Sequence, residues 1–303
     1  MNASSRHLLA IRGMTRPEVE ALLEAAARHK QARQAGAPLR VLTGRLVANL
    51  FFEDSTRTRS SFEIAAKSLG GEVLSWTAKG SSVAKGETLV DTARNIDAMR
   101  PAAIVMRHDQ SGAAALVARH VRSPVVNAGD GTHEHPSQAL LDAFTLRERL
   151  GSLDGKHILI VGDILHSRVA RSNLHCLRLL GAKVTFCGPV TLVPRGSEEL
   201  GAQVSYDFDQ VLPEADGVMM LRLQLERQTQ SLFPSAREYA RRYGLNAARA
   251  AKMKPGAIVL HPGPINRGVE LSWDVADSER SVVLHQVENG VAVRMAVLER
   301  SCA

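Results

Sequence analysis

Short apolar runs alternate along this chain with segments of helical periodicity, and no other feature constrains the fold as strongly. Val19, Leu22 and Ala26 have helical spacing, and Thr15 with Glu18 before them forms a capping-box pattern. Alternating strands and helices predict parallel sheets covered by helices on both faces, so the expected fold is α/β. The apolar runs, read as strands, are 46–52, 72–76, 103–107, 125–127, 157–161, 183–187, 217–221 and 257–261.

The length of the chain indicates two domains. A chain of 303 residues usually folds in this way, and its apolar content suffices for two cores. Two sheets of about four strands each, flanked by helices, are therefore expected. The segment 151–156, Gly-Ser-Leu-Asp-Gly-Lys, is predicted to be a loop near the domain boundary. A final helical pattern includes Val291, Met295 and Leu298.

The charge balance bears on the class of partner. The 38 basic and 31 acidic residues give a net charge of +7, which could favour nucleic acid. The arginines are scattered, however, and only 4% of residues are aromatic, so a surface for stacking bases is not expected. Small anionic molecules are the predicted partners, and no nucleic acid is expected.

Cysteine usage and hydropathy bear on the compartment. Cys176, Cys187 and Cys302 are odd in number and lack metal or redox spacing, so neither a disulfide nor a zinc site is expected. No apolar run approaches the roughly 18 residues of a membrane span. Residues 7–14 are too short and too charged for a signal peptide. We therefore expect a cytoplasmic protein without a membrane partner.

Residues 51–59, Phe-Phe-Glu-Asp-Ser-Thr-Arg-Thr-Arg, place hydroxyl and guanidinium groups where a strand ends and a helix should begin. A helix N-terminus has unpaired N–H groups and partial positive charge, so it favours a phosphoryl group. Ser55, Thr56 and Thr58 add hydroxyl donors, and the two arginines add planar forks that match phosphate oxygens. An ordinary capped helix is the alternative. Because the hydroxyl–arginine pairs exceed what capping requires, a phosphate site is predicted.

The same segment resembles the carbamoyl-phosphate loop of the aspartate/ornithine carbamoyltransferase family. Matching motifs continue to about residue 270 and fit the aspartate branch. The resemblance implies that no cofactor is needed and that carbamoyl phosphate is bound by Ser55, Thr56, Arg57 and Thr58. It also implies a carbamoyl-phosphate-binding domain of residues 1–136, completed by a C-terminal helix 288–303, and an aspartate-binding domain of residues 137–287.

Two further segments match the family's carbamoyl-phosphate site. Arg107 ends an apolar run, where parallel sheets place ligand groups, although a surface ion pair is the alternative; His108 is expected to be structural. In 127–138, a metal site at the histidines is disfavoured because no cysteine or carboxylate has helical ligand spacing. By resemblance, Arg107 contacts phosphate and carbonyl oxygen, His135 donates to the carbamoyl oxygen, and Gln138 is a partner of the carbamoyl nitrogen.

The second half of the chain carries the motifs that match aspartate binding. Val161-Gly162-Asp163 could suggest a dinucleotide site, but the later glycines of that fingerprint are missing. The resemblance instead assigns Arg168 to the α-carboxylate of aspartate. It assigns Arg222 and Gln224 to the second carboxylate, whereas a solvated helix face is the alternative for their segment.

The segment 261–264, His-Pro-Gly-Pro, stands where ornithine carbamoyltransferases have a cysteine-containing element, which counts against ornithine. By resemblance, Gly263 and Pro264 place backbone groups near the reacting amine. The bond between them is a candidate cis peptide.

A polar loop, 81–87, is the last matching element. It could be an ordinary surface loop. In the family, its lysine and serine enter the neighbouring subunit's site, where they contact phosphate and carboxylate. The lysine matches Lys85, and Ser81 is preferred to Ser82 for the serine. The resemblance therefore implies a homotrimer with shared active sites, and it allows regulatory or dihydroorotase-like subunits as further partners.

The implied reaction needs no metal. The neutral α-amine of aspartate attacks the carbonyl of carbamoyl phosphate, and Thr58, Arg107 and His135 stabilise the charge that grows on the carbonyl oxygen. No residue is an obvious general base, so phosphate itself could accept the proton. The leaving phosphate would be bound by Ser55, Thr56, Arg57, Thr58 and Lys85.

Domain closure is also expected from the family. There the glutamate equivalent to Glu53 pairs with the arginines equivalent to Arg168 and Arg227 when the domains close, which expels water from the site. Three other functions compete with aspartate carbamoylation. They are transfer to ornithine or another amine, a non-catalytic structural paralogue, and a nucleic-acid-binding module.

Overall fold

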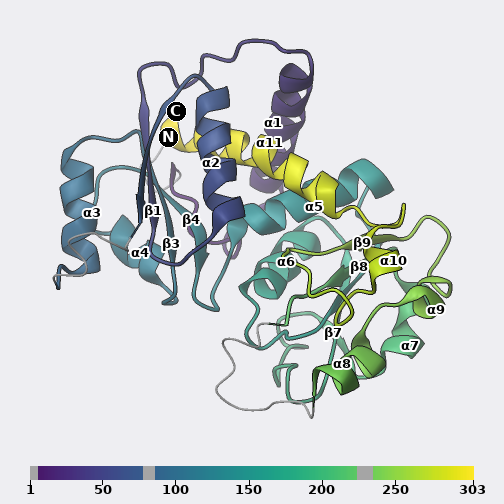
Figure 1. Ribbon diagram of the computed structural model, residues 1–303. Helices are drawn as coiled ribbons and strands as arrows, with labels where there is room; N and C mark the ends of the chain where they lie inside the picture. The colour runs from purple at the N-terminus through teal and green to yellow at the C-terminus, as the bar shows by residue number, and fades with distance from the viewer. Residues whose placement is uncertain (1–5, 78–85, 224–234) are drawn as a thin grey trace. The chain divides into compact units, whose positions relative to one another are not determined.

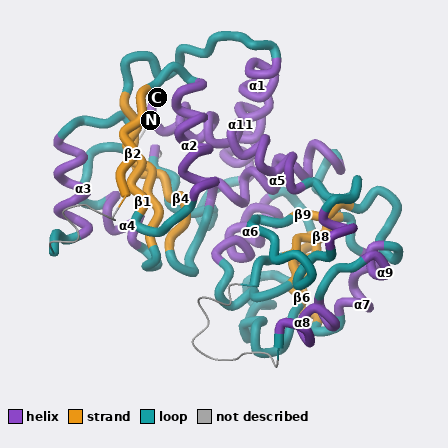
Figure 2. Tube along the Cα trace, viewed as in Figure 1, coloured by secondary structure: helices purple, strands orange, loops and turns teal. Residues whose placement is uncertain are grey.

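The computed structural model describes residues 6–77, 86–223 and 235–303. The chain forms two compact units, which we call unit 1 (Met1–Phe144 with Glu288–Ala303) and unit 2 (Thr145–Val287). Each unit contains one parallel sheet with helices packed on it (Figures 1 and 2). The predicted α/β fold with two sheets is confirmed. The predicted functional division of the chain at residues 136 and 137 stays a prediction.

Unit 1 has a four-stranded parallel sheet in the order β2-β1-β3-β4. Helices α3 and α4 lie on one side of this sheet and α2 lies on the other (Figure 1). The strands are β1 (Leu46–Phe51), β2 (Glu72–Thr77), β3 (Ala103–His108) and β4 (Val125–Asp130). The helices are α1 (Arg16–Gln34), α2 (Thr56–Ser68), α3 (Leu89–Ala98), α4 (Ala113–Ala118), α5 (Pro136–Leu150) and α11 (Val283–Cys302), of which α5 and α11 extend into unit 2.

The central strands of unit 1 are apolar on both faces because helices cover both faces. Leu50 and Met106 are opposite each other in the β1–β3 register and are almost fully buried. They pack with Ile96 of α3 and Val117 of α4 in one core. Helix α1 begins at the predicted capping box, and α11 is tied to it by a 2.9 Å contact between His29 Nε2 and Glu299.

Unit 2 has a five-stranded parallel sheet in the order β7-β6-β5-β8-β9, one strand more than the approximate four expected. The additional strand, β7, has only three residues at an edge of the sheet, and Val204 is its only apolar residue, so no alternating pattern marks it. The strands are β5 (His157–Val161), β6 (Lys183–Cys187), β7 (Gln203–Ser205), β8 (Gly217–Met220) and β9 (Ile258–Leu260).

The core of unit 2 forms where side chains of β5, β8 and β9 meet the surrounding helices. Val161, Met220 and Val259 belong to one buried cluster with Phe208 and Tyr239. The helices of this unit are α6 (Arg168–Leu179), α7 (Phe208–Val211), η3 (Leu212–Glu214), α8 (Ala236–Tyr243), α9 (Ala247–Ala250) and α10 (Trp273–Ala276).

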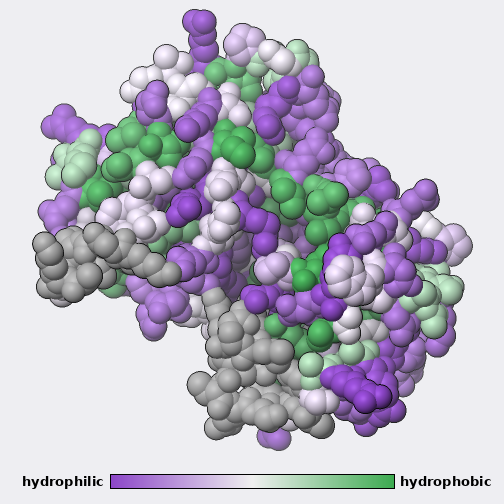
Figure 3. All heavy atoms as spheres, in the orientation of Figure 1, coloured by the Kyte–Doolittle hydropathy of each residue, from purple (hydrophilic) through white to green (hydrophobic). Residues whose placement is uncertain are grey.

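The surface is largely hydrophilic on the face drawn in Figure 3, with smaller hydrophobic groups between the polar side chains. None of the helices in the described ranges has the length and apolar character that crossing a bilayer requires.

Asp97, in the last turn of α3, connects this helix to the segment that leads into β4. Its carboxylate accepts hydrogen bonds from Ser123 N at 2.9 Å, Ser123 Oγ at 2.7 Å and Arg122 N at 3.1 Å. Burial alone would raise the pKa of Asp97. The hydrogen bonds from Ser123 and Arg122, with the Arg122 charge, outweigh burial, and the pKa of Asp97 lies below its ordinary value.

We predict that Asp97→Asn lowers the free energy of unfolding by about 2 kcal/mol at neutral pH, because charge-assisted hydrogen bonds are lost while the shape is kept. The folded-state pKa is depressed, so this stabilisation is present above the unfolded pKa and is lost as pH falls through the folded pKa. Urea unfolding of both proteins at neutral and acid pH measures the difference in the free energy of unfolding. Glu72→Gln, at an exposed carboxylate, is the control. A difference from the unsubstituted protein that did not shrink in acid would contradict the assignment.

Candidate active site

Three neighbouring strands of unit 1 end beside one another. In the order β2-β1-β3-β4, residues 55–58 follow β1, Arg107 lies near the end of β3, and His135 and Gln138 follow β4. The carboxyl ends of neighbouring parallel strands meet at one edge of a sheet, where α/β proteins bind ligands. The topology therefore gathers the predicted carbamoyl-phosphate residues of unit 1 at a single edge.

The start of α2 has the features of an anion site. Ser55 is the N-cap residue, yet its side chain makes no capping hydrogen bond within the described part of the chain. None of the first-turn residues of α2, all of which the structure describes, is acidic. Thr56 and Arg57 are exposed and Thr58 is buried. The partial positive charge of the helix terminus is therefore left for an anion rather than for a carboxylate of the same turn.

Arg107 forms an ion pair that is mostly buried, unlike the surface pair considered as an alternative. Its Nη2 lies 3.1 Å from Glu53 Oε1, and both side chains are 12% exposed. Its Nη1 donates to the Ala128 carbonyl at 3.4 Å. These contacts hold the guanidinium at the end of β3. The predicted grouping of Glu53 with Arg168 and Arg227 stays a prediction, since Arg227 lies outside the described residues.

His108 lies beside Arg107 and has structural contacts. Its Nδ1 accepts a hydrogen bond from Gln110 N at 2.9 Å, and its ring centroid lies 5.1 Å from that of Phe52. Burial lowers the pKa of His108, although the nearby Asp109 and Asp130 carboxylates oppose this effect. A neutral imidazole can accept the Gln110 hydrogen bond, which supports the structural role expected for it.

The loop that leads to His135 is held by buried carboxylates. Asp130 accepts hydrogen bonds from Asn127 Nδ2 and Gly112 N, both at 2.7 Å. Glu134 accepts from Ile11 N at 2.7 Å and Arg12 N at 3.0 Å. These contacts fix the backbone on both sides of the turn, so the residue that follows, His135, is presented from a rigid support.

The two histidines of this loop differ in their surroundings. His133 Nδ1 lies 3.1 Å from Asp130 Oδ2, and His135 is 4% exposed. Among the described residues there is no group of three histidine, cysteine or carboxylate side chains that could hold a metal ion.

Gln138 lies in the first turn of α5 and is buried. Its Nε2 donates a 2.9 Å hydrogen bond to Asp142 Oδ1, one turn further along the helix. Because the amide nitrogen faces the carboxylate, the amide oxygen Oε1 is the group that can accept a hydrogen bond from a carbamoyl –NH₂. The role of Gln138 as a partner of the carbamoyl nitrogen stays a prediction.

Unit 2 repeats this arrangement at the end of its own sheet. Strands β5, β8 and β9 are neighbours, and Arg168, Arg222 and Gly263 follow them respectively. Arg168 is the first residue of α6 and is 6% exposed. The peptide bond between Gly263 and Pro264 is cis, as the resemblance indicated. The described residues that are predicted to bind aspartate thus follow three adjacent strands of one sheet.

Hydrogen bonds connect the last two of these segments. Asn266 Nδ2 donates to the Leu223 carbonyl at 3.0 Å, so the loop after β9 is tied to the segment after β8. His261 Nε2 lies 3.1 Å from Glu270 Oε1, and both side chains are fully buried. Gly263 N donates to His261 Nδ1 at 2.8 Å. The cis-proline loop is therefore anchored in the core.

Gly162 has a packing role. Its φ is +135°, and a Cβ there would lie 3.0 Å from Leu221 Cβ and 3.1 Å from Tyr239 Oη. The glycine after β5 is needed for close approach to its neighbours, which agrees with the incomplete dinucleotide fingerprint. Ser81, Ser82, Lys85 and Gln224 lie outside the described residues, so their predicted roles stay predictions.

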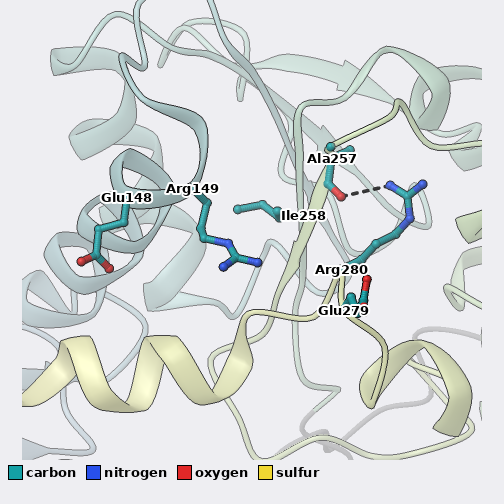
Figure 4. Close-up of a pocket in the computed structure, with 7 residues that line it drawn as sticks. Glu148, Arg149, Ala257, Ile258, Glu279 and Arg280 are labelled. Carbon is teal, nitrogen blue, oxygen red and sulfur yellow. Dashed lines mark hydrogen bonds between the residues drawn. The ribbon is translucent and has the colours of Figure 1, made fainter.

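A pocket in unit 2 is separate from all of the predicted residues (Figure 4). Its volume is about 570 Å³. Arg280 beside it donates to the Ala257 carbonyl at 3.1 Å and to the Lys254 carbonyl at 2.9 Å, which indicates a structural role for this arginine. The lining residues are Glu148, Arg149, Gly256, Ala257, Ile258, Glu279 and Arg280.

Asp142 and Arg294 are two of the buried charged residues of unit 1 that the sequence pattern did not single out. Asp142 is fully buried in α5 and Arg294 is 4% exposed in α11. Each is a single charged residue between apolar neighbours on a buried helix, and burying a charge is costly unless another group compensates it. A single charged residue within an apolar helical segment is the sequence pattern that could have identified both residues.

Two α/β units, each with arginine side chains at the carboxyl edge of a parallel sheet, are typical of the class of two-domain proteins that bind small ligands at such edges. Comparison with known proteins identifies the particular family. Residues 6–148 match the carbamoyl-P binding domain, and residues 154–300 the Asp/Orn binding domain, of the aspartate/ornithine carbamoyltransferases. The chain belongs to this family.

Similar proteins fall in the aspartate branch. The chain is 66% identical over 296 residues to the aspartate carbamoyltransferase catalytic subunit of Myxococcus xanthus, covering 97% of this chain and 98% of that protein. It is 57% identical over 297 residues to the aspartate carbamoyltransferase catalytic subunit of Anaeromyxobacter sp. strain K, and the match covers 97% of this chain and 94% of that protein. A Trypanosoma cruzi aspartate transcarbamoylase structure with carbamoyl phosphate and aspartate has a TM-score of 0.90 at 33% identity, covering 99% of this chain and 97% of that one.

Proposed function

We propose that this protein transfers the carbamoyl group of carbamoyl phosphate to the α-amine of L-aspartate, giving N-carbamoyl-L-aspartate and phosphate. The reaction belongs to pyrimidine biosynthesis, and we place it in the cytoplasm. The observation that carries the proposal is the gathering of residues 55–58, Arg107 and His135 at one sheet edge of unit 1. The similarity to aspartate carbamoyltransferases over nearly the whole chain supports it.

The carbamoyl-phosphate residues have complementary tasks in this proposal. Ser55, Thr56 and Arg57 bind the phosphate at the positive end of α2. Thr58, Arg107 and His135 donate to the carbonyl oxygen as the aspartate amine attacks it, and Gln138 accepts from the carbamoyl nitrogen. A well-placed donor of this kind contributes about 3 to 4 kcal/mol to the transition state.

The aspartate residues distinguish this acceptor from ornithine. Arg168 binds the α-carboxylate, and Arg222 with Gln224 binds the second carboxylate. The backbone of Gly263 and Pro264 contacts the reacting amine. Two guanidinium groups favour a dicarboxylate over a side chain that carries an amine.

The direct test is a carbamoyl-transfer assay with carbamoyl phosphate and either L-aspartate or L-ornithine. We expect N-carbamoyl-L-aspartate and phosphate to form in equal amounts, and little product with ornithine. Turnover of ornithine alone, or of neither amine, would overturn the proposal.

We predict that Arg57→Ala lowers kcat by about a hundredfold or more with both substrates saturating, because the lost contact strengthens as the leaving phosphate gains charge. Arg28→Ala, at an exposed arginine of α1, is the matched control and should keep its activity. Circular dichroism should show that both variants fold. A decrease of less than about tenfold for Arg57→Ala would rule out the phosphate assignment.

We predict that Arg222→Ala raises the KM for aspartate by roughly tenfold to a hundredfold while changing the KM for carbamoyl phosphate far less, because a charged hydrogen bond to one substrate is lost. Succinate, which has two carboxylates and no amine, should compete with aspartate in the unsubstituted protein. This inhibition should weaken in the variant. Equal succinate inhibition of both proteins would show that Arg222 does not bind the second carboxylate.

We further propose that the protein is a homotrimer in which Ser81 and Lys85 of one chain enter the site of its neighbour. Arg57→Ala and Lys85→Ala would then inactivate different halves of a shared site. Each variant should be inactive alone, and dissociated and reassociated mixtures should regain activity well above either parent. Native mass spectrometry verifies that hybrids form. Hybrid trimers as inactive as their parents would contradict the shared site.

A further inference from the structure

Arg294 is a buried cation of α11 that the proposed mechanism does not use. It is 4% exposed, and its Cζ lies 5.2 Å from the centroid of the Phe62 ring in α2. One turn earlier in α11, a Cβ on Gly290 would lie 2.5 Å from Arg294 Nη1. The glycine thus leaves space for the guanidinium, which lies between its own helix and the helix that carries the phosphate residues.

The electrostatic surroundings of Arg294 connect it to the proposed site. Burial lowers the pKa of Arg294 to about 10; the Asp142 carboxylate opposes this shift, and the Arg107 and Arg57 charges add to it. The guanidinium therefore stays charged at neutral pH. The packing also brings α5 to this point, because a Cβ on Gly290 would lie 3.3 Å from Cδ2 of Leu141, the residue before Asp142.

Asp142 requires such a cation. It is fully buried, and a buried carboxylate keeps its charge only where nearby cations or donors compensate the loss of water. An ionised carboxylate has acceptors and no donor, so it pairs with the –NH₂ of the Gln138 amide and not with its oxygen. A neutral carboxyl group could donate to the amide oxygen, and the Gln138 amide could then rotate so that its oxygen faces Asp142. The charge of Asp142 consequently decides which end of the Gln138 amide faces the ligand.

We propose that Arg294 is a positioning residue that keeps Asp142 ionised and thereby orients the Gln138 amide with its oxygen toward the carbamoyl nitrogen. This inference rests on the proposed function and extends it, because it assigns the discrimination between a carbamoyl amide and a carboxylate to a residue that touches no substrate. A ligand –NH₂ finds an acceptor at Gln138 Oε1, whereas a ligand carboxylate meets an oxygen and is repelled.

Two phosphonates test this discrimination in the full-length protein without aspartate. Phosphonoacetamide carries the amide, and phosphonoacetate carries a carboxylate in its place. Calorimetry should show tighter binding of the amide by the unsubstituted protein. In Arg294→Met and in Asp142→Asn, the ratio of the two dissociation constants should fall by about tenfold, because one hydrogen bond to the amide is lost and one to the carboxylate becomes possible. Arg294→Lys, which keeps the charge, should retain most of the ratio.

Arg249→Met in unit 2 is the matched control. Arg249 is also buried, its Cζ also lies 5.2 Å from a phenylalanine ring, that of Phe208, and it pairs with Asp209. This variant should lose stability without a change in the ratio. If Arg294→Met does not fold, Asp142→Asn and Arg294→Lys decide the question.

The outcomes separate the inference from the proposed function. A preference ratio unchanged in the folded variants, equal weakening of both phosphonates, or no preference in the unsubstituted protein would overturn the role of Arg294. Failure of the unsubstituted protein to bind either phosphonate would overturn the proposed carbamoyl-phosphate site as well. Normal phosphonate binding with no carbamoyl transfer to aspartate would count only against the proposed reaction.

Discussion

Parallel strand pairing is the constraint on which the rest of this structure depends. In a parallel sheet, all carboxyl ends lie at one edge, and each crossover returns the chain to the opposite edge. Residues that follow β1, β3 and β4 in unit 1 therefore become neighbours although up to about 80 positions separate them in the sequence. Unit 2 uses the same geometry with β5, β8 and β9. The grouping of each predicted set of site residues depends on strand order rather than on sequence proximity.

Buried polar groups then give these loops defined positions. Asp130 and Glu134 accept backbone and side-chain hydrogen bonds around the turn before His135, and Glu270 does so beside the cis-proline loop. Such groups are costly to bury without partners and stabilising with them, so they favour one loop conformation. Segments that connect strands, which are otherwise the most variable parts of a fold, become rigid supports for the site.

Charge organises unit 1 in two layers. Arg57 belongs to the exposed first turn of α2, where it can meet an anion. Arg107 lies deeper, with its Nη2 3.1 Å from Glu53 Oε1, and Arg294 is buried on α11. Several guanidinium groups of like charge are tolerable in a small volume because carboxylates compensate them and because the expected ligand is an anion.

The sequence by itself determined the elements and their chemistry. Apolar periodicity located eight of the nine strands, since buried strands and helices need continuous apolar faces, and the hydroxyl, arginine and histidine motifs were recognisable at the strand ends. Only the tertiary structure decided which polar groups meet. Three contacts show this. Glu53 pairs with Arg107 at the end of β3, and Asp142 accepts a hydrogen bond from Gln138 one helical turn away. Arg294 of α11 lies over the Phe62 ring of α2. The short edge strand β7 forms by pairing with β6, and its three residues have no apolar alternation that would predict a strand.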